Sequence, residues 1–309
     1  MRDGITLVAG SDDCPLWQGF DFSAAATIYS QLTGVLAGFA FVAITLMLNR
    51  QHRREALGVG DPVEELAQDR RNIAALGCAF LGLLATTVMY ATISSERACA
   101  LTDGRVASEE VLAGVAFAFS LYTLLFAAVQ LVSAASLGTH LRFVVVVIVP
   151  PIVVMFVLAG LDDLALAMAD PPENPVAHQP LQPVWTTSSR ALWDLAHTLS
   201  LWLPVGAFVV CGVMWWLGRA VRRADGSPAR PMALALTALP YISLALVLYV
   251  VWQSTSVDTL DPGFHLSPGS AWTLVGISMA VVFAQSACLS FERGEDHNPR
   301  VTPKTPPDT

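Results

Sequence analysis

Apolar residues gather into long blocks along this chain and do not follow the i, i+3, i+4 spacing of a helix on a protein surface. A helix needs about 20 consecutive, mostly apolar residues to cross a bilayer. Seven blocks meet that requirement: Ala24 to Leu48, Ile73 to Ile93, Val111 to Leu137, Phe143 to Leu161, Leu192 to Leu217, Met232 to Val251 and Ala271 to Leu289. The pattern predicts an all-α fold, a polytopic bundle of seven transmembrane helices.

The composition supports a membrane protein, because 54% of the residues are hydrophobic and only 14% are charged. We expect an extracytoplasmic N-terminal tail over 1–23, a seven-helix domain over 24–291 and a disordered cytoplasmic tail over 292–309. The first apolar block is too long for a cleaved signal peptide, so we interpret it as a retained helix. The last segment is polar and rich in proline, which is typical of disorder.

The basic residues predict the orientation. When the connections are assigned alternately to two sides, 13 of the 17 basic residues fall on one side and four on the other. The side of a membrane protein that is rich in arginine and lysine normally faces the cytoplasm. We therefore expect a multi-pass protein of the cytoplasmic (inner) membrane with its N-terminus outside and its C-terminus inside.

Acidic residues follow the opposite trend. Fifteen of the 25 fall on the predicted outer side, which then has a net charge of −11, against +3 on the inner side. A negative outer face concentrates cations near any entrance there. Alternatively, the acids carry no function and lie outside only because the arginines lie inside.

Prolines interrupt three of the predicted spans near the middle of the membrane: Pro150 and Pro151 in the fourth, Pro204 in the fifth and Pro240 in the sixth. Each proline releases the carbonyl four residues before it, and in lipid that carbonyl needs another partner. One interpretation is a set of kinked helices that line a site or act as hinges, as in transporters with broken helices. The other is ordinary tolerance of proline in packed membrane helices. Under either, the proline pair should face other helices.

An outer acidic pocket is the candidate ligand site. Asp194 and His197 lie one helical turn apart at the start of the fifth span, and Asp163 ends the fourth span on the same side. These groups could bind a cation or relay a proton through His197; alternatively, they are wetted groups at the lipid interface. Ser200, Thr237 and Tyr241 lie near the prolines and are further candidates for ligand-binding residues.

The start of the third span resembles a helix N-terminus. Ser108 can cap the helix, and Glu109 and Glu110 then face the positive end of the helix dipole. We expect a second helix start at Asp61, which would carry the second helix through Arg70 and Arg71 into the bilayer.

Two cysteines share the predicted outer compartment: Cys14 in the N-terminal tail and Cys99 in the first outer loop. An oxidising compartment permits a disulfide between them, although the sequence does not decide whether it forms.

Several function classes find no support. A microbial rhodopsin needs a lysine in the last span to hold retinal, and the only lysine here is Lys304. Seven-span zinc hydrolases need several histidines facing one cavity, whereas only His197 lies within a span. The run from Val35 to Ile44 resembles the first helix of store-operated calcium channels, but the basic segment follows this run here and precedes it there. We expect no catalytic residues, metal site, cofactor or nucleic-acid partner, and an enzyme is the least supported class.

Two functions stay open. The first is a channel or transporter for a cation or small solute that uses the proline-kinked central helices. The second is a non-transporting sensor or accessory subunit, whose helix from Asp61 to Arg71 and arginine-rich loops bind a cytoplasmic protein partner or anionic lipid. Under either we expect the lipid bilayer as a partner, and a homo-oligomer is possible.

Overall fold

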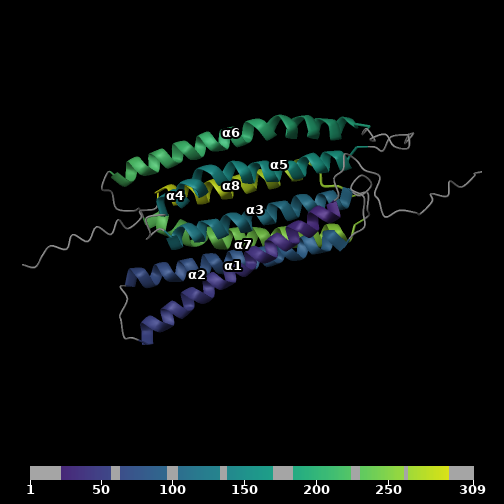
Figure 1. Ribbon diagram of the computed structural model, residues 1–309. Coiled ribbons are helices and arrows are strands. Elements are labelled where there is room, and N and C mark those ends of the chain that lie inside the picture. The colour runs from purple at the N-terminus through teal and green to yellow at the C-terminus, as the bar shows by residue number, and fades with distance from the viewer. Residues whose placement is uncertain are drawn as a thin grey trace, which may run out of the picture.

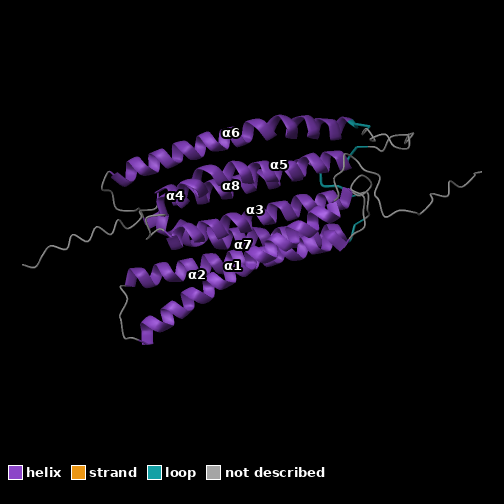
Figure 2. Ribbon diagram, in the orientation of Figure 1, coloured by secondary structure: helices purple, strands orange, loops and turns teal. Residues whose placement is uncertain are grey.

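The described part of the chain is almost entirely helical. A computed structural model describes residues 22–56, 63–95, 104–132, 138–169, 184–223, 230–260 and 264–291. Within these ranges 95% of the residues are helical and there is no strand, as Figure 2 shows. The predicted all-α fold is confirmed.

The described residues form seven helical spans, and each is long and apolar enough to cross a membrane. The fourth is built from α4, a π-helical turn η1 and α5; the others are single helices. Their bounds are α1 (Phe22–Ala56), α2 (Val63–Ser95), α3 (Gly104–Val132), α4 (Gly138–Phe143), η1 (Val144–Ile148), α5 (Val149–Ala167), α6 (Thr187–Arg223), α7 (Arg230–Asp258) and α8 (Pro268–Phe291). The described part of the chain is therefore that of a multi-pass membrane protein with seven spans.

Helix α3 forms the centre of the bundle, packed against α2, α5, α7 and α8. Of its most apolar stretch 78% is buried, against 17% for α1 and 22% for α6. Small residues such as Ala113, Gly114 and Ala116 let neighbouring backbones approach α3 closely. Figure 1 shows α1 and α2 on one side of α3 and α6 on the opposite side, where α6 contacts α5 and α8.

Hydroxyl groups join the first third of α1 to the last third of α2. Ser23 donates to the carbonyl of Ser94 at 3.0 Å, Ser30 to the carbonyl of Thr87 at 3.3 Å, and Thr87 to the hydroxyl of Thr33 at 2.8 Å. In lipid, where apolar contact alone gives little driving force, such bonds help to hold a peripheral helix in place.

The two ends of the bundle differ in charge. At the end that we call the acidic end, α3 begins and α5 ends, with Asp162 and Asp163 in the last turns of α5. At the opposite end, which we call the arginine-rich end, α1 ends with Arg53 and Arg54 in its last turn. Helix α1 begins at the acidic end and α8 ends at the arginine-rich end, as an odd number of spans requires (Figure 1).

The prediction that Ser108 caps α3 is wrong, because the helix begins one turn earlier, at Gly104. The Ser108 hydroxyl donates to the Gly104 carbonyl at 2.7 Å and accepts from the Leu266 backbone at 2.9 Å. A β-carbon on Gly104 would lie 2.7 Å from the Phe264 carbonyl oxygen, so this glycine allows the segment before α8 to pack on the start of α3. The extra turn places Glu109 and Glu110 deeper in the bundle than the sequence pattern indicated.

The proline pair is accommodated by the π-helical turn η1. In this turn the backbone N–H of Val149 donates to the carbonyl of Val144, five residues earlier. The carbonyl of Val145 would then need the N–H of residue 150, and proline has none. The hydroxyl of Tyr122 on α3 donates to it instead, at 2.9 Å. The prediction that the proline pair faces other helices is confirmed for Pro150, which is buried with Val145, Val146 and Val147, whereas Pro151 is only half-buried.

The other two prolines lie inside continuous helices. Pro204 is buried in α6 and Pro240 in α7. The hydroxyls beside Pro204 serve earlier carbonyls, because Thr198 donates to Asp194 and Ser200 to His197 at 2.7 Å each. Among the described spans that contain proline, only the fourth departs from α-helical geometry.

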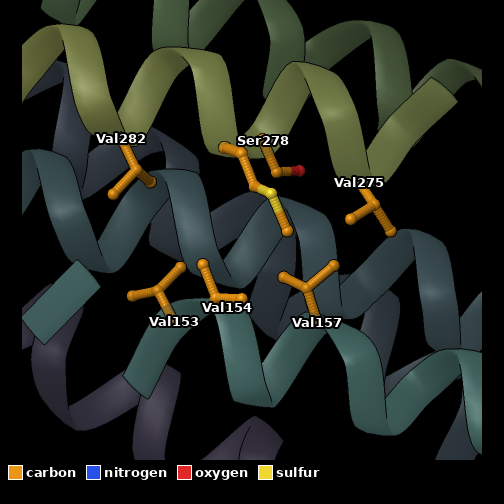
Figure 3. A pocket seen from close by; sticks show the side chains of 7 residues that line it. Val153, Val154, Val157, Val275, Ser278 and Val282 are labelled. Carbon is orange, nitrogen blue, oxygen red and sulfur yellow. The ribbon is translucent and has the colours of Figure 1, made fainter. Parts of the chain in front are cut away.

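A small apolar pocket lies between α5 and α8, towards the middle of the bundle. Figure 3 shows Val153, Val154 and Val157 of α5 facing Val275 and Val282 of α8 across it. Ser278 also lines the pocket, and its hydroxyl donates a hydrogen bond to the carbonyl of Leu274 in its own helix at 2.8 Å. Met279 completes a lining that is apolar except for this hydroxyl, and we call it the dry valine layer because its five valines offer water no hydrogen-bond partner.

Candidate functional site

The acidic cluster comprises Glu110 of α3 with Asp162 and Asp163 of α5. Two glycines bring these helices together: a β-carbon on Gly160 would lie 3.5 Å from Val111, and one on Gly114 would lie 3.5 Å from Phe156. Because α3 and α5 run in opposite directions, these contacts set Glu110 beside the last turns of α5. The close approach of the two helices therefore places the carboxyl groups near one another.

The carboxyl groups of the cluster act on one another electrostatically. Asp163 lies close enough to Glu110, and Asp162 close enough to Asp163, for their carboxyl groups to interact electrostatically. The Oε2 atom of Glu110 and the Oδ1 atom of Asp162 are enclosed, and neither has a hydrogen-bond partner among the described residues. Enclosed carboxylate oxygens normally find a partner, so these two atoms make the cluster the candidate site.

A group of aromatic rings adjoins the acidic cluster. Tyr29 of α1 and Tyr90 of α2 stack with ring centroids 5.3 Å apart, and both lie near enough to Glu110 to interact with it electrostatically. Tyr29 also meets the ring of Phe156 at 5.5 Å, and Phe156 meets Phe117 at 5.4 Å. These rings keep the cluster in apolar surroundings, where electrostatic interactions are stronger than in water.

The cluster lies at one depth in four helices. Glu110 is six residues from the start of α3 and Asp163 four residues from the end of α5, which corresponds to about 9 and 6 Å along the helix axes. Tyr29 and Tyr90 lie at comparable distances from the ends of α1 and α2. The cluster is thus inside the bundle but within a few turns of its acidic end.

The predicted outer pocket is divided by the structure. Asp163 joins Glu110 inside the bundle, whereas Asp194 is exposed on α6 and pairs with Arg190 at 3.9 Å. His197 is exposed on the same helix and stacks on the ring of Trp193 with centroids 6.0 Å apart. His197 acts electrostatically on Asp162 and so lies at the edge of the cluster.

The three other candidates do not lie at this site. Ser200 is half-buried on α6 and bonds its own helix. Thr237 and Tyr241 of α7 are exposed on the surface of the bundle. The structure does not bring them together with Asp163. Cys14 and Cys99, for which a disulfide was considered, lie outside the described residues, as does Asp61.

Sequence reasoning missed Glu110, Tyr29 and Tyr90 as parts of a site. The signal for Glu110 was present: the residues before it, Gly104 to Ala107, include Val106 and Ala107 and can extend the helix by one turn. The tyrosines gave no signal of their own. Among the described residues, no three His, Cys, Asp or Glu side chains lie close enough together to hold a metal ion.

Comparison with known proteins adds no assignment. No protein-family model matches the chain, and no curated protein is significantly similar to it. The described part of the chain is that of an integral membrane protein, and its function has to be inferred from the cluster itself.

Proposed function

We propose that the protein carries protons across the membrane and that the acidic cluster is its proton-binding site. The enclosed, unpartnered carboxylate oxygen of Glu110 beside Asp163 supports this function best. Like charges in apolar surroundings repel one another strongly, and a bound cation removes that repulsion. Acidic residues inside membrane helices often mark ion or proton pathways.

The geometry favours the proton over a larger cation. One carboxylate oxygen is enough to hold a proton, whereas a metal ion needs several ligands that converge on one point. Phe117 and Phe156 pack against Tyr29 and against each other, on the side of the cluster that faces the interior of the bundle. A proton requires no cavity, and the cluster can accept one without repacking these rings.

The dry valine layer between α5 and α8 gives such a carrier a barrier against leakage. It separates the acidic cluster from the π-helical turn, because its lining residues Val153 to Val157 lie between Val145 and Asp163 along the fourth span. Apolar constrictions stop conduction by excluding water. In the proposed cycle, protons pass only when this layer opens.

The test is proton flux into liposomes that contain the purified protein and an internal pH-sensitive dye. We expect an imposed pH gradient to dissipate with wild-type protein, and the rate to fall at least tenfold with Glu110→Gln or Asp163→Asn. Asp194→Asn is the matched control, because it removes a carboxylate that is exposed on α6 near the same end. It should keep the wild-type rate.

Equal rates for wild type and Glu110→Gln would rule out the acidic cluster as the proton site. Sodium and potassium gradients at constant pH form a second arm of the same experiment. If sodium or potassium flux depends on Glu110, the acidic cluster is still a cation site, but the ion carried is that metal ion and not the proton.

A second function, a sensor or accessory subunit, is supported by the arginine-rich end. Arg50 and Arg53 are exposed at the end of α1, beyond its apolar stretch, where anionic lipid or an acidic partner can reach them. Absence of flux under every gradient would favour this function. Native mass spectrometry should then show bound anionic lipid on wild-type protein and less of it on the Arg50→Gln, Arg53→Gln double variant.

A further inference from the structure

A second buried polar cluster joins α3, α7 and α8, and the proposed function does not use it. The amide nitrogen Nε2 of Gln285 donates to the hydroxyl of Ser243 at 2.8 Å and to that of Thr123 at 3.3 Å. All three side chains are buried, and Gln285 is 0% exposed. Thr123 is 13 residues beyond Glu110, about 20 Å further along α3.

The side-chain amide of Gln285 has partners for its nitrogen but none for its oxygen among the described residues. Both N–H groups of the amide are donated, and the Thr123 hydroxyl donates its own proton to the carbonyl of Phe119 at 2.8 Å. The amide oxygen Oε1 is enclosed and has no hydrogen-bond partner. Rotating the side-chain amide of Gln285 by half a turn exchanges its oxygen and its NH₂ group. The NH₂ group would then lie in the enclosed position, where its two N–H groups would need acceptors. A buried amide oxygen without a donor costs about 1–3 kcal/mol, so a missing donor is expected here.

Other polar groups lie in the same layer. The hydroxyls of Tyr122 and Ser286 bond each other, and Tyr122 also donates to the Val145 carbonyl that the π-helical turn releases. The thiol of Cys211 on α6 lies beside the hydroxyl of Ser286. Hydroxyl, amide, thiol and backbone groups therefore face inward from five spans at this depth.

We propose that one ordered water molecule is held in this layer and donates a hydrogen bond to Oε1 of Gln285. The named groups of the layer are neutral, so the layer offers a metal cation no counter-charge, whereas a small neutral donor fits its hydrogen-bonding needs. Buried waters typically bond to otherwise unsatisfied polar groups and form part of the fold. This water site does not depend on the proton function of the acidic cluster.

Hydroxyl-radical footprinting by X-ray radiolysis tests the water site, because a bound water generates radicals beside side chains that bulk solvent cannot reach. The Tyr122 side chain is 0% exposed to bulk solvent, but its hydroxyl belongs to the polar layer. We therefore expect Tyr122 to be labelled in wild-type protein. Phe126, one turn further along α3 and also 0% exposed, is the internal control and should stay unlabelled. In Gln285→Met, which keeps the side-chain length, labelling of Tyr122 should fall at least fivefold.

Two results would overturn the water site. One is labelling of Tyr122 no higher than that of Phe126 in wild-type protein, and the other is unchanged labelling of Tyr122 in Gln285→Met. If Gln285→Met does not yield a monodisperse protein, density decides the question in wild-type protein. A map at about 2 Å resolution should then show a water about 2.7–3.2 Å from Oε1, and an empty position would count against the site.

Discussion

At the scale of single residues, Gly218 sets how closely α6 packs on α8. A β-carbon at this position would lie 2.7 Å from the carbonyl carbon of Ser290 and closer still to its oxygen. Both atoms belong to the backbone and cannot turn aside. Gly212, on the same helix, has no other atom within 4 Å of the corresponding position. Comparing alanine substitutions at the two glycines therefore distinguishes the effect of close helix packing from the effect of helix propensity.

We expect Gly218→Ala to lower the stability of the protein by about 1–3 kcal/mol, because the new methyl group forces α6 away from α8. Gly212→Ala should be neutral or should stabilise by up to about 1 kcal/mol, since alanine favours a helix over glycine. Thermal unfolding midpoints in detergent compare the two variants with wild type. Equal midpoints for the two variants would contradict the close approach.

At the scale of helices, the π-helical turn and the prolines that follow it form one unit with Tyr122. The turn leaves the Val145 carbonyl without a backbone donor, and the tyrosine hydroxyl supplies the missing hydrogen bond. Any residue other than proline at position 150 would have a backbone N–H, and in π-helical geometry this N–H would donate to the Val145 carbonyl. The tyrosine and the proline are therefore coupled across two helices.

Tyr122→Phe should destabilise the protein by about 1–3 kcal/mol, because a buried carbonyl loses its partner. In a Pro150→Ala background the same change should cost less than half as much, since the N–H of alanine can then bond to Val145. A double-mutant cycle on unfolding midpoints measures this coupling, and Tyr241→Phe, at an exposed position on α7, is the neutral control. Additive effects would show that the two residues are independent.

Hydropathy predicted the spans because the thickness of a bilayer fixes how many apolar residues a helix needs. It placed their ends less well, since helical turns outside the lipid carry polar residues. The third span was predicted from Val111 and begins at Gly104, and this difference hid Glu110 from the candidate site. Asp163 could be selected from the sequence, but its neighbours could not, because the packing of α3 against α5 decides them. The π-helical turn likewise depends on a donor from another helix.

At the scale of the whole molecule, the seven spans put the acidic and arginine-rich ends on opposite sides of the membrane. The distribution of arginine predicts that the acidic end faces outward, and this orientation is open to a direct measurement. Val184, before α6, and His140, in α4, are exposed and lie at the acidic and arginine-rich ends respectively.

In a variant that lacks the native cysteines, Val184→Cys should react with a membrane-impermeant thiol reagent in intact cells. His140→Cys should react only after the cells are opened, because it lies on the cytoplasmic side in the predicted orientation. Mass spectrometry of the purified variants measures the labelling. The opposite pattern would reverse the topology and place the acidic cluster near the cytoplasm.

The central position of α3 has a consequence for biosynthesis. Thr123 bonds to Gln285, which is 162 residues later in the chain. At about 5–20 residues per second, the ribosome needs about 8–30 s to make that partner. Until α7 and α8 have been made, the polar groups of α3 that bond to these helices lack those partners. We infer that the nascent third span is sheltered by α2 or by the insertion machinery until the last span arrives.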